Sequence, residues 1–263
     1  MQSNTPKIHQ LARNAGNAIM EIYQHTFEVH NKADNSPVTA ADMAAHHILV
    51  NGLSALTPSY PVLSEESGDD IKEQRLNWST YWLIDPLDGT KEFIKRNGEF
   101  TVNIALIENG VPIMGIVYAP ALDTLYWGEL GRGAFKQIGQ SAIEPIHVTH
   151  IPTTDKGWRV VGSRSHQTPE FSDFMQKLPE ADIVAMGSSL KLCLIAEGKA
   201  DLYPRLGPTS EWDTAAAHAI VIAAGGQVVE WPTLTPLTYN QRPETLLNPY
   251  FIACPGQSDY WSN

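Results

Sequence analysis

The sequence predicts a fold of mixed class, α+β over residues 1–150 and α/β over residues 151–263. Apolar and polar residues alternate over 101–118, and the hairpin signal Asn109-Gly110 interrupts them, which indicates an antiparallel sheet. In the second part short apolar segments alternate with helical ones, as is typical of α/β structure. The polar stretch His150–Lys156 separates the two patterns and is the expected boundary.

Each expected element follows from its periodicity. Apolar residues at helical spacing predict helices over 8–23 and 40–53, and an aromatic-rich apolar run predicts a buried strand over 81–84. The antiparallel meander is expected to contain strands at 101–107, 111–118, 125–127 and 133–135. In the second part we expect strands at 159–162, 183–185, 200–203 and 227–230. Helices are expected there at 170–178, 189–197 and 213–224.

The composition of the chain limits which classes of protein it can belong to. A chain of 263 residues with 43% hydrophobic and 18% charged residues is globular and long enough to bury about three quarters of its unfolded surface. The net charge of -11 argues against binding a nucleic acid polymer through a general basic surface. We see no transmembrane segment and no signal peptide. Cys193 and Cys254 lack metal-type spacing, which favours ordinary thiols in a cytoplasmic protein.

The most informative stretch is Asp85-Pro86-Leu87-Asp88-Gly89-Thr90, directly after the run at 81–84. Two carboxylates this close repel each other unless a cation lies between them, and hard cations such as magnesium prefer oxygen ligands. The Leu87 carbonyl offers a third oxygen. Gly89 and Thr90 then begin an expected short helix, 90–94, whose first amides would face an anion. The same residues also make a good turn, so the motif alone leaves both interpretations open.

Each acidic residue elsewhere in the chain, considered alone, fits either a role in such a site or a purely structural role. Glu65 follows a short apolar run and has a solvated acidic loop as its alternative explanation. Asp213 precedes an alanine-rich helix, which it could simply cap. Thr39 and Asp42 resemble a capping box at the start of the helix expected over 40–53.

Taken together, these motifs resemble the inositol monophosphatase superfamily of magnesium-dependent, lithium-sensitive phosphatases. The matching segments lie at 32–42, 64–66, 85–90 and 212–216. Further segments resemble one branch, the 3'(2'),5'-bisphosphate nucleotidases of the bacterial CysQ type; these lie at 85–103, 163–166, 187–191 and 203–205. The resemblance runs from about residue 11 almost to the C-terminus, except for loops near 68–80 and 136–157. It implies the layered αβαβα fold of sugar phosphatases, with most metal ligands in the first part and the nucleotide-binding segments and Asp213 in the second.

The resemblance also implies a site that uses Mg²⁺ as its cofactor. One ion would be held by Glu65, Asp85 and the Leu87 carbonyl, and a second by Asp85, Asp88 and Asp213. Glu65 and the Thr90 hydroxyl would orient and deprotonate the attacking water, with Asp42 behind Thr90. The residues expected to contact the substrate are Glu65, Leu87, Asp88, Gly89, Thr90, Ser163, His166, Gly187, Lys191 and Asp213.

The implied activity is hydrolysis of the 3'-phosphate of adenosine 3',5'-bisphosphate, and of its 5'-phosphosulfate relative, in sulfur assimilation. An inositol monophosphatase is the alternative; Lys191 favours the nucleotide because a long cation suits a second phosphate. Haloacid-dehalogenase-type phosphatases are excluded, since their two acids are separated by one residue and Asp85 and Asp88 by two. A non-catalytic phosphonucleotide-binding protein is disfavoured because the ligand acids are all present. The sequence leaves monomer and homodimer open, as it does peripheral attachment to the cytoplasmic side of the inner membrane.

Overall fold

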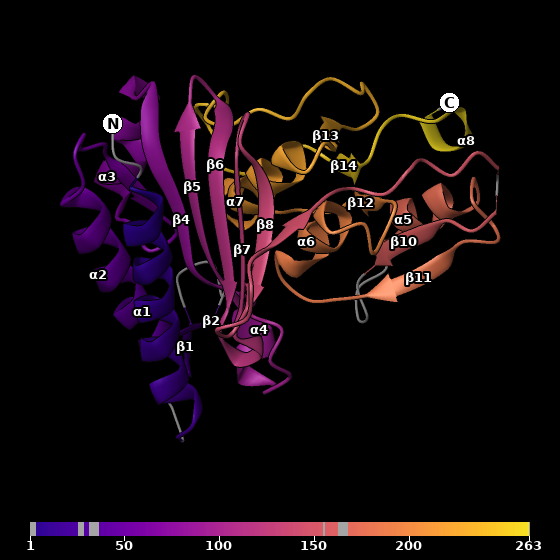
Figure 1. The fold of residues 1–263 in the computed structure, drawn as a ribbon. Coiled ribbons are helices and arrows are strands. Elements are labelled where there is room, and N and C mark those ends of the chain that lie inside the picture. The colour runs from indigo at the N-terminus through magenta and orange to yellow at the C-terminus, as the bar shows by residue number, and fades with distance from the viewer. Residues whose placement is uncertain (1–3, 26–28, 32–36, 155, 163–167, 263) are drawn as a thin grey trace.

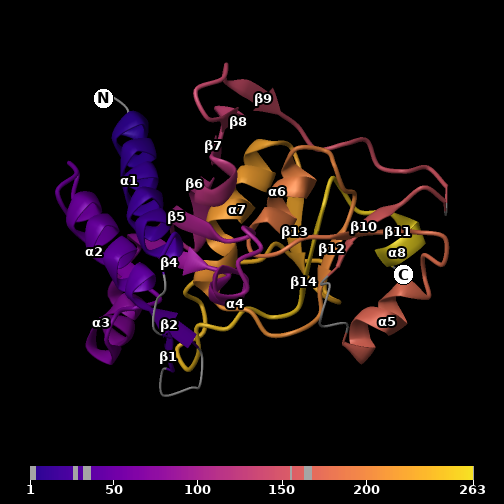
Figure 2. The ribbon, with the colours of Figure 1, turned by 90° about the horizontal axis from the view of Figure 1, so that it is seen from below.

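A computed structural model of the chain describes residues 4–25, 29–31, 37–154, 156–162 and 168–262. The elements form layers in the order helix, sheet, helix, sheet, helix (Figures 1 and 2). This arrangement confirms the predicted αβαβα class. No helix in these described ranges is long and apolar enough to span a membrane.

The larger sheet has the strand order β3-β4-β5-β6-β7-β8-β9. Its strands are β3 (Val62–Ser64), β4 (Thr80–Asp88), β5 (Thr101–Glu108), β6 (Val111–Ala119), β7 (Thr124–Glu129), β8 (Gly133–Ile138) and β9 (Glu144–Ile146). Only the β3–β4 pair is parallel. The four strands of the predicted meander are confirmed, and β5 and β6 join at Asn109-Gly110, where both residues have positive φ, as a tight hairpin requires. The strand predicted at 81–84 is longer than expected.

The first helical layer covers the outer face of this sheet. It consists of α1 (Thr5–Tyr23) and α2 (Ala40–Ser54), close to the predicted ranges. Buried alanines on both helices let them pack closely on each other and on the sheet. Two short strands, β1 (Val29–Asn31) and β2 (Pro37–Thr39), pair before α2. The helix α3 (Asp69–Gln74) lies between β3 and β4 in the chain.

The second sheet layer consists of a two-stranded sheet, β10-β11, and a three-stranded sheet, β12-β14-β13. β10 (Arg159–Gly162) pairs in parallel with β11 (Asp182–Ala185), and a parallel bridge joins Val160 to Leu202. β14 (Phe251–Cys254) lies antiparallel between β12 (Tyr203–Arg205) and β13 (Gln227–Glu230). The strand predicted at 200–203 was misplaced, because the extended pairing with β14 begins only at Tyr203. Periodicity also did not predict β14, whose four residues are all buried. The outer helices are α5 (Pro169–Met175) and α8 (Asp259–Ser262).

The central layer joins the two sheets. It contains α6 (Leu190–Ala196) and α7 (Glu211–Ala223), and α7 packs against β4–β8 of the larger sheet although it belongs to the second part of the chain (Figure 2). Its small side chains, including Ala215, Ala216 and Ala219, are buried there. The boundary near residue 150 remains a prediction, since the two parts share this helical layer.

At Gly115 the backbone of β6 packs directly against the backbone of α7. We therefore expect Gly115→Ala to destabilise the fold by about 3 kcal/mol. A methyl group there would overlap the backbone carbonyl oxygen of Ala216, and neither a strand nor a helix backbone yields easily. Urea unfolding measures the loss. The control is Gly207→Ala, whose added carbon would lie 3.5 Å from the Thr168 Cγ2 atom and should change stability by less than about 0.5 kcal/mol. Similar stabilities for the two variants would contradict the packing argument.

Candidate active site

The site begins at an irregularity in β4. The strand pairs with β5 through Asp85 opposite Asn103, and the pairing resumes only at Asp88 opposite Thr101. Pro86 has no N–H to donate to the ladder, and the Leu87 N–H instead donates to Asp85 Oδ1 at 3.0 Å. The bulge therefore brings two acidic residues toward one place at the end of a buried strand.

Asp213 reaches the same place from α7. The helix begins at Glu211 with Ser210 as its N-cap, so Asp213 is not the N-cap residue that the alternative interpretation made it. Asp213 is instead the third helical residue of a capping box, and its Oδ2 accepts a hydrogen bond from the Ser210 N–H at 3.0 Å. Asp85, Asp88 and Asp213 each offer an oxygen, and these oxygens lie within 4.8 Å of one another.

The mutual repulsion of these buried carboxylates makes the cluster suitable for binding a cation. Burial first, and then the charges of Glu65, Asp88, Asp213 and Asp42, raise the pKa of Asp85 well above its usual range. Burial and the neighbouring Asp88 raise the pKa of Asp213 to about 8. A divalent cation would reverse both effects, since it favours the ionised carboxylates. The donor set consists of hard oxygens, which suits a hard divalent cation.

The remaining residues predicted for the reacting end lie around the cluster. Glu65 directly follows β3, and its N–H donates to the carbonyl of Ile84 on β4 at 3.1 Å, which puts Glu65 beside the strand end that carries Asp85. Thr90 Oγ1 lies 3.3 Å from the Leu87 carbonyl and 3.4 Å from Asp42 Oδ1. Asp42 in turn accepts hydrogen bonds from the Thr39 N–H and hydroxyl at 2.7 and 2.8 Å. The predicted capping box at Thr39 is confirmed.

The short helix α4 (Thr90–Ile94) has the predicted bounds. Gly89 precedes it with φ of 89°, a left-handed conformation that side chains rarely adopt. A Cβ atom at Gly89 would also lie 3.1 Å from the carbonyl oxygen of Glu99. Glycine thus lets the chain turn sharply from the bulge, which carries Asp85 and Asp88, into the helix.

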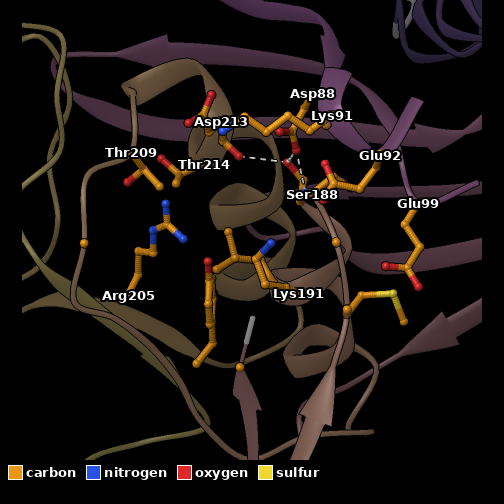
Figure 3. Close-up of a pocket in the computed structure, with 18 of the residues that line it drawn as sticks. Asp88, Lys91, Glu92, Glu99, Ser188, Lys191, Arg205, Thr209, Asp213 and Thr214 are labelled. Carbon is orange, nitrogen blue, oxygen red and sulfur yellow. Dashed lines mark hydrogen bonds between the residues drawn. The ribbon is translucent and has the colours of Figure 1, made fainter. Parts of the chain in front are cut away.

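A cavity of about 520 Å³ adjoins the acidic cluster (Figure 3). Lys191 and Arg205 line one side, and Glu92 and Glu99 line another. The Lys191 ammonium lies 5.9 Å from the centre of the Tyr203 ring. Sequence reasoning did not select Arg205 as a site residue. The available signal was a cation at the end of the apolar segment that forms β12.

Gly187 also borders the cavity, and its lack of a side chain has a steric reason. A Cβ atom there would lie 2.9 Å from Glu99 Cβ and 3.0 Å from Glu92 Cγ. The backbone of 187–189 can therefore pass close to α4 and reach the acidic cluster. The other two predicted nucleotide contacts, Ser163 and His166, lie outside the described residues.

Comparison with known proteins gives consistent similarities. The model of the inositol monophosphatase family matches residues 2–258. The 3'(2'),5'-bisphosphate nucleotidase CysQ of Escherichia coli (strain K12) is 52% identical over 247 residues, covering 93% of this chain and 97% of that protein. The protein of the same name from Haemophilus influenzae is 40% identical over 253 residues, which cover 95% of this chain and 92% of that protein.

Solved structures agree with these sequence relatives. CysQ from Bacteroides thetaiotaomicron, described as a bacterial member of the inositol monophosphatase family, superposes with a TM-score of 0.83 at 43% identity, covering 98% of this chain and 99% of its own. Inositol monophosphatase from Anabaena superposes with a TM-score of 0.70 at 27% identity, and the match covers 94% of this chain and 88% of that one.

Proposed function

The chain belongs to the inositol monophosphatase family, and we propose that it is a 3'(2'),5'-bisphosphate nucleotidase. Its substrate would be adenosine 3',5'-bisphosphate, with 3'-phosphoadenosine 5'-phosphosulfate as a second, and the products AMP or adenosine 5'-phosphosulfate plus phosphate. The observation that carries this proposal is the charge pattern of one cavity. The acidic cluster lies at one end for a metal-bound reacting phosphate, and Lys191 and Arg205 lie beside it for a second anion.

We propose Mg²⁺ as the cation. Glu65, Asp85 and the Leu87 carbonyl would hold one ion, and Asp85, Asp88 and Asp213 a second. Bound there, the ions would lower the pKa of water and stabilise negative charge on the leaving oxygen.

The protein's own groups would position the reacting water and phosphate for direct attack on phosphorus. Thr90 Oγ1 and the Glu65 carboxylate would orient the water, and its proton would go to the Glu65 carboxylate or, through the Thr90 hydroxyl, to the Asp42 carboxylate. Asp42 would fix the Thr90 hydroxyl through the contact at 3.4 Å. The N–H groups of Gly89 and Thr90 would hold the phosphate oxygens at the N-terminus of α4.

The side of the cavity lined by Lys191 and Arg205 would select the nucleotide. Lys191 would meet the non-reacting 5'-phosphate or phosphosulfate, and Arg205, which lines the same cavity, would add a second cation. Gly187 lets the backbone of 187–189 pass close to Glu92 and Glu99, and Ser163 and His166 remain proposed contacts to the nucleoside.

One assay separates this function from the inositol monophosphatase alternative. Phosphate release is measured side by side from adenosine 3',5'-bisphosphate and inositol 1-phosphate with magnesium. We expect kcat/KM for the nucleotide to be higher by at least tenfold, because only the nucleotide supplies an anion for Lys191 and Arg205. Equal or reversed preference would overturn the nucleotidase assignment and leave a family phosphatase.

Lithium is expected to inhibit uncompetitively with respect to the nucleotide at millimolar concentration. The singly charged ion would occupy the second cation position after hydrolysis, where it cannot fully replace a divalent ion in stabilising the departing phosphate. Initial rates at several substrate concentrations, with and without lithium chloride, test this, and potassium chloride at the same ionic strength is the control. Insensitivity to lithium would argue against the proposed second ion.

In the cell we place this activity in sulfur assimilation, clearing the nucleotide by-product of sulfate reduction in the cytoplasm. The proposed partner is a small phosphorylated nucleotide and not a nucleic acid polymer. Monomer and homodimer, and peripheral attachment to the inner membrane, remain open predictions.

A further inference from the structure

We infer that Ser189 is a positioning residue that holds Asp88 and Asp213 together for the second cation. The inference rests on the proposed metal-dependent function. Ser189 precedes α6 and is only 3% exposed, directly beneath the acidic cluster. It is neither an acid nor one of the residues predicted to contact metal or substrate.

The contacts of Ser189 join the two ligands. Its N–H donates to Asp88 Oδ2 at 2.6 Å, and its hydroxyl lies 2.8 Å from the same oxygen. The hydroxyl also lies 2.8 Å from the backbone carbonyl oxygen of Asp213. Figure 3 draws these Ser189 bonds as dashed lines in the space between the labelled Asp88 and Asp213. One hydroxyl thus touches a residue of the β4 bulge and a residue of α7, two elements that are far apart in the sequence.

A buried amide orients that hydroxyl. Asn103 Nδ2 donates to Ser189 Oγ at 2.7 Å, and Asn103 is fully buried on β5. Because the amide donor occupies one side of the oxygen, the single hydroxyl proton is directed to the side where Asp88 Oδ2 and the Asp213 carbonyl oxygen lie, and it donates to one of these two acceptors at a time. Thr101 Oγ1 supports the same arrangement, since it lies 3.0 Å from Asn103 Oδ1 and 3.4 Å from Asp88 Oδ2.

The arrangement assigns different tasks to the two oxygens of Asp88. The N–H and hydroxyl of Ser189 both lie against Oδ2, with Thr101 Oγ1 3.4 Å from the same oxygen, which leaves Oδ1 to turn toward the cation. Ligating carboxylates are commonly held in this way by outer hydrogen bonds, and removing such a bond costs roughly 10- to 100-fold in metal affinity or activity. The backbone of the preceding residue supports the same conclusion, because Ser188 has φ of 45°, a conformation that is strained for serine and brings the Ser189 N–H to Asp88.

The test measures binding of Mn²⁺ alone, without substrate, by titration calorimetry and by the electron paramagnetic resonance signal of free Mn²⁺. Ser189→Ala keeps the backbone N–H but removes the hydroxyl, so the weaker of two Mn²⁺ sites should lose about tenfold in affinity. Ser189→Thr restores a hydroxyl and should recover most of the loss. Ser189→Cys, with a weaker donor of similar size, should lie between alanine and wild type.

A double-mutant cycle tests the role of Asn103. If its amide acts through the hydroxyl, Asn103→Ala should weaken Mn²⁺ binding in the wild-type background but add nothing to Ser189→Ala. Thr124→Val is the matched control, because it also removes a buried hydroxyl that bonds a backbone carbonyl, here that of Leu122 at 3.0 Å. The control should lower the melting temperature in EDTA without changing Mn²⁺ affinity.

The outcomes distinguish the inference from the function on which it rests. Unchanged Mn²⁺ affinity in Ser189→Ala, or equal losses in Ser189→Ala and Thr124→Val, would overturn the positioning role. Failure of the wild-type protein to bind Mn²⁺ would instead overturn the proposed metal-dependent function.

Discussion

Asp88→Asn is expected to reduce kcat by at least about a hundredfold while leaving the fold intact. Asparagine keeps the shape of the side chain but removes the negative charge that we propose the second cation requires. Asp88 shares the acidic cluster with Asp85 and Asp213, whose offered oxygens lie within 4.8 Å of its own. Losing stabilisation of the leaving oxygen at this point should raise the barrier by several kcal/mol.

Two measurements check this expectation. Phosphate release is followed under saturating magnesium, and thermal unfolding is followed in EDTA, where the variant should be no less stable because one repulsive charge is gone. Asp123→Asn is the matched control: Asp123 is a partly exposed acid outside the acidic cluster, and its φ of 42° suits asparagine. The control should retain wild-type activity. Activity above a tenth of wild type in Asp88→Asn would remove Asp88 from the proposed ligands.

Lys191→Ala is expected to lower kcat/KM for adenosine 3',5'-bisphosphate by about ten- to a hundredfold and to leave inositol 1-phosphate nearly unaffected. The Lys191 side chain lines the cavity beside the acidic cluster, where it would meet the non-reacting phosphate. Charge-assisted hydrogen bonds of this kind contribute about 1.5–3 kcal/mol. Inositol 1-phosphate has no second phosphate, so removing Lys191 removes no contact to that substrate.

The division between KM and kcat adds information. A contact that is equal in ground and transition states appears in KM, whereas a contact that also aligns the reacting phosphate appears partly in kcat. Lys177→Ala is the control, since the Lys177 ammonium also lies over an aromatic ring, 5.1 Å from the centre of Trp231, but outside the cavity lining. Equal losses on the two substrates in Lys191→Ala would mean that Lys191 serves the metal site or the fold.

Local patterns in the sequence determined most of the elements of this protein. Alternation and the Asn109-Gly110 turn predicted the β5–β6 hairpin, because a strand with one buried face must alternate and a tight turn needs residues that tolerate positive φ. Thr39 and Asp42 predicted the cap of α2 for a similar reason, since a capping box involves only neighbours in the chain. Asp85 and Asp88 were expected together at the end of a strand, and the bulge places them there.

Only the tertiary structure decided how distant segments meet. Periodicity missed β14 because its position between β12 and β13 depends on pairing with strands far from it in the sequence. Asp213 joins the acidic cluster because α7 packs across the larger sheet, where Gly115 allows its backbone to come close. Ser189 and Arg205 lie in segments that resemble the nucleotidases, but the sequence does not show which atoms their side chains meet. Their contacts arise from long-range packing, which no short window of sequence contains.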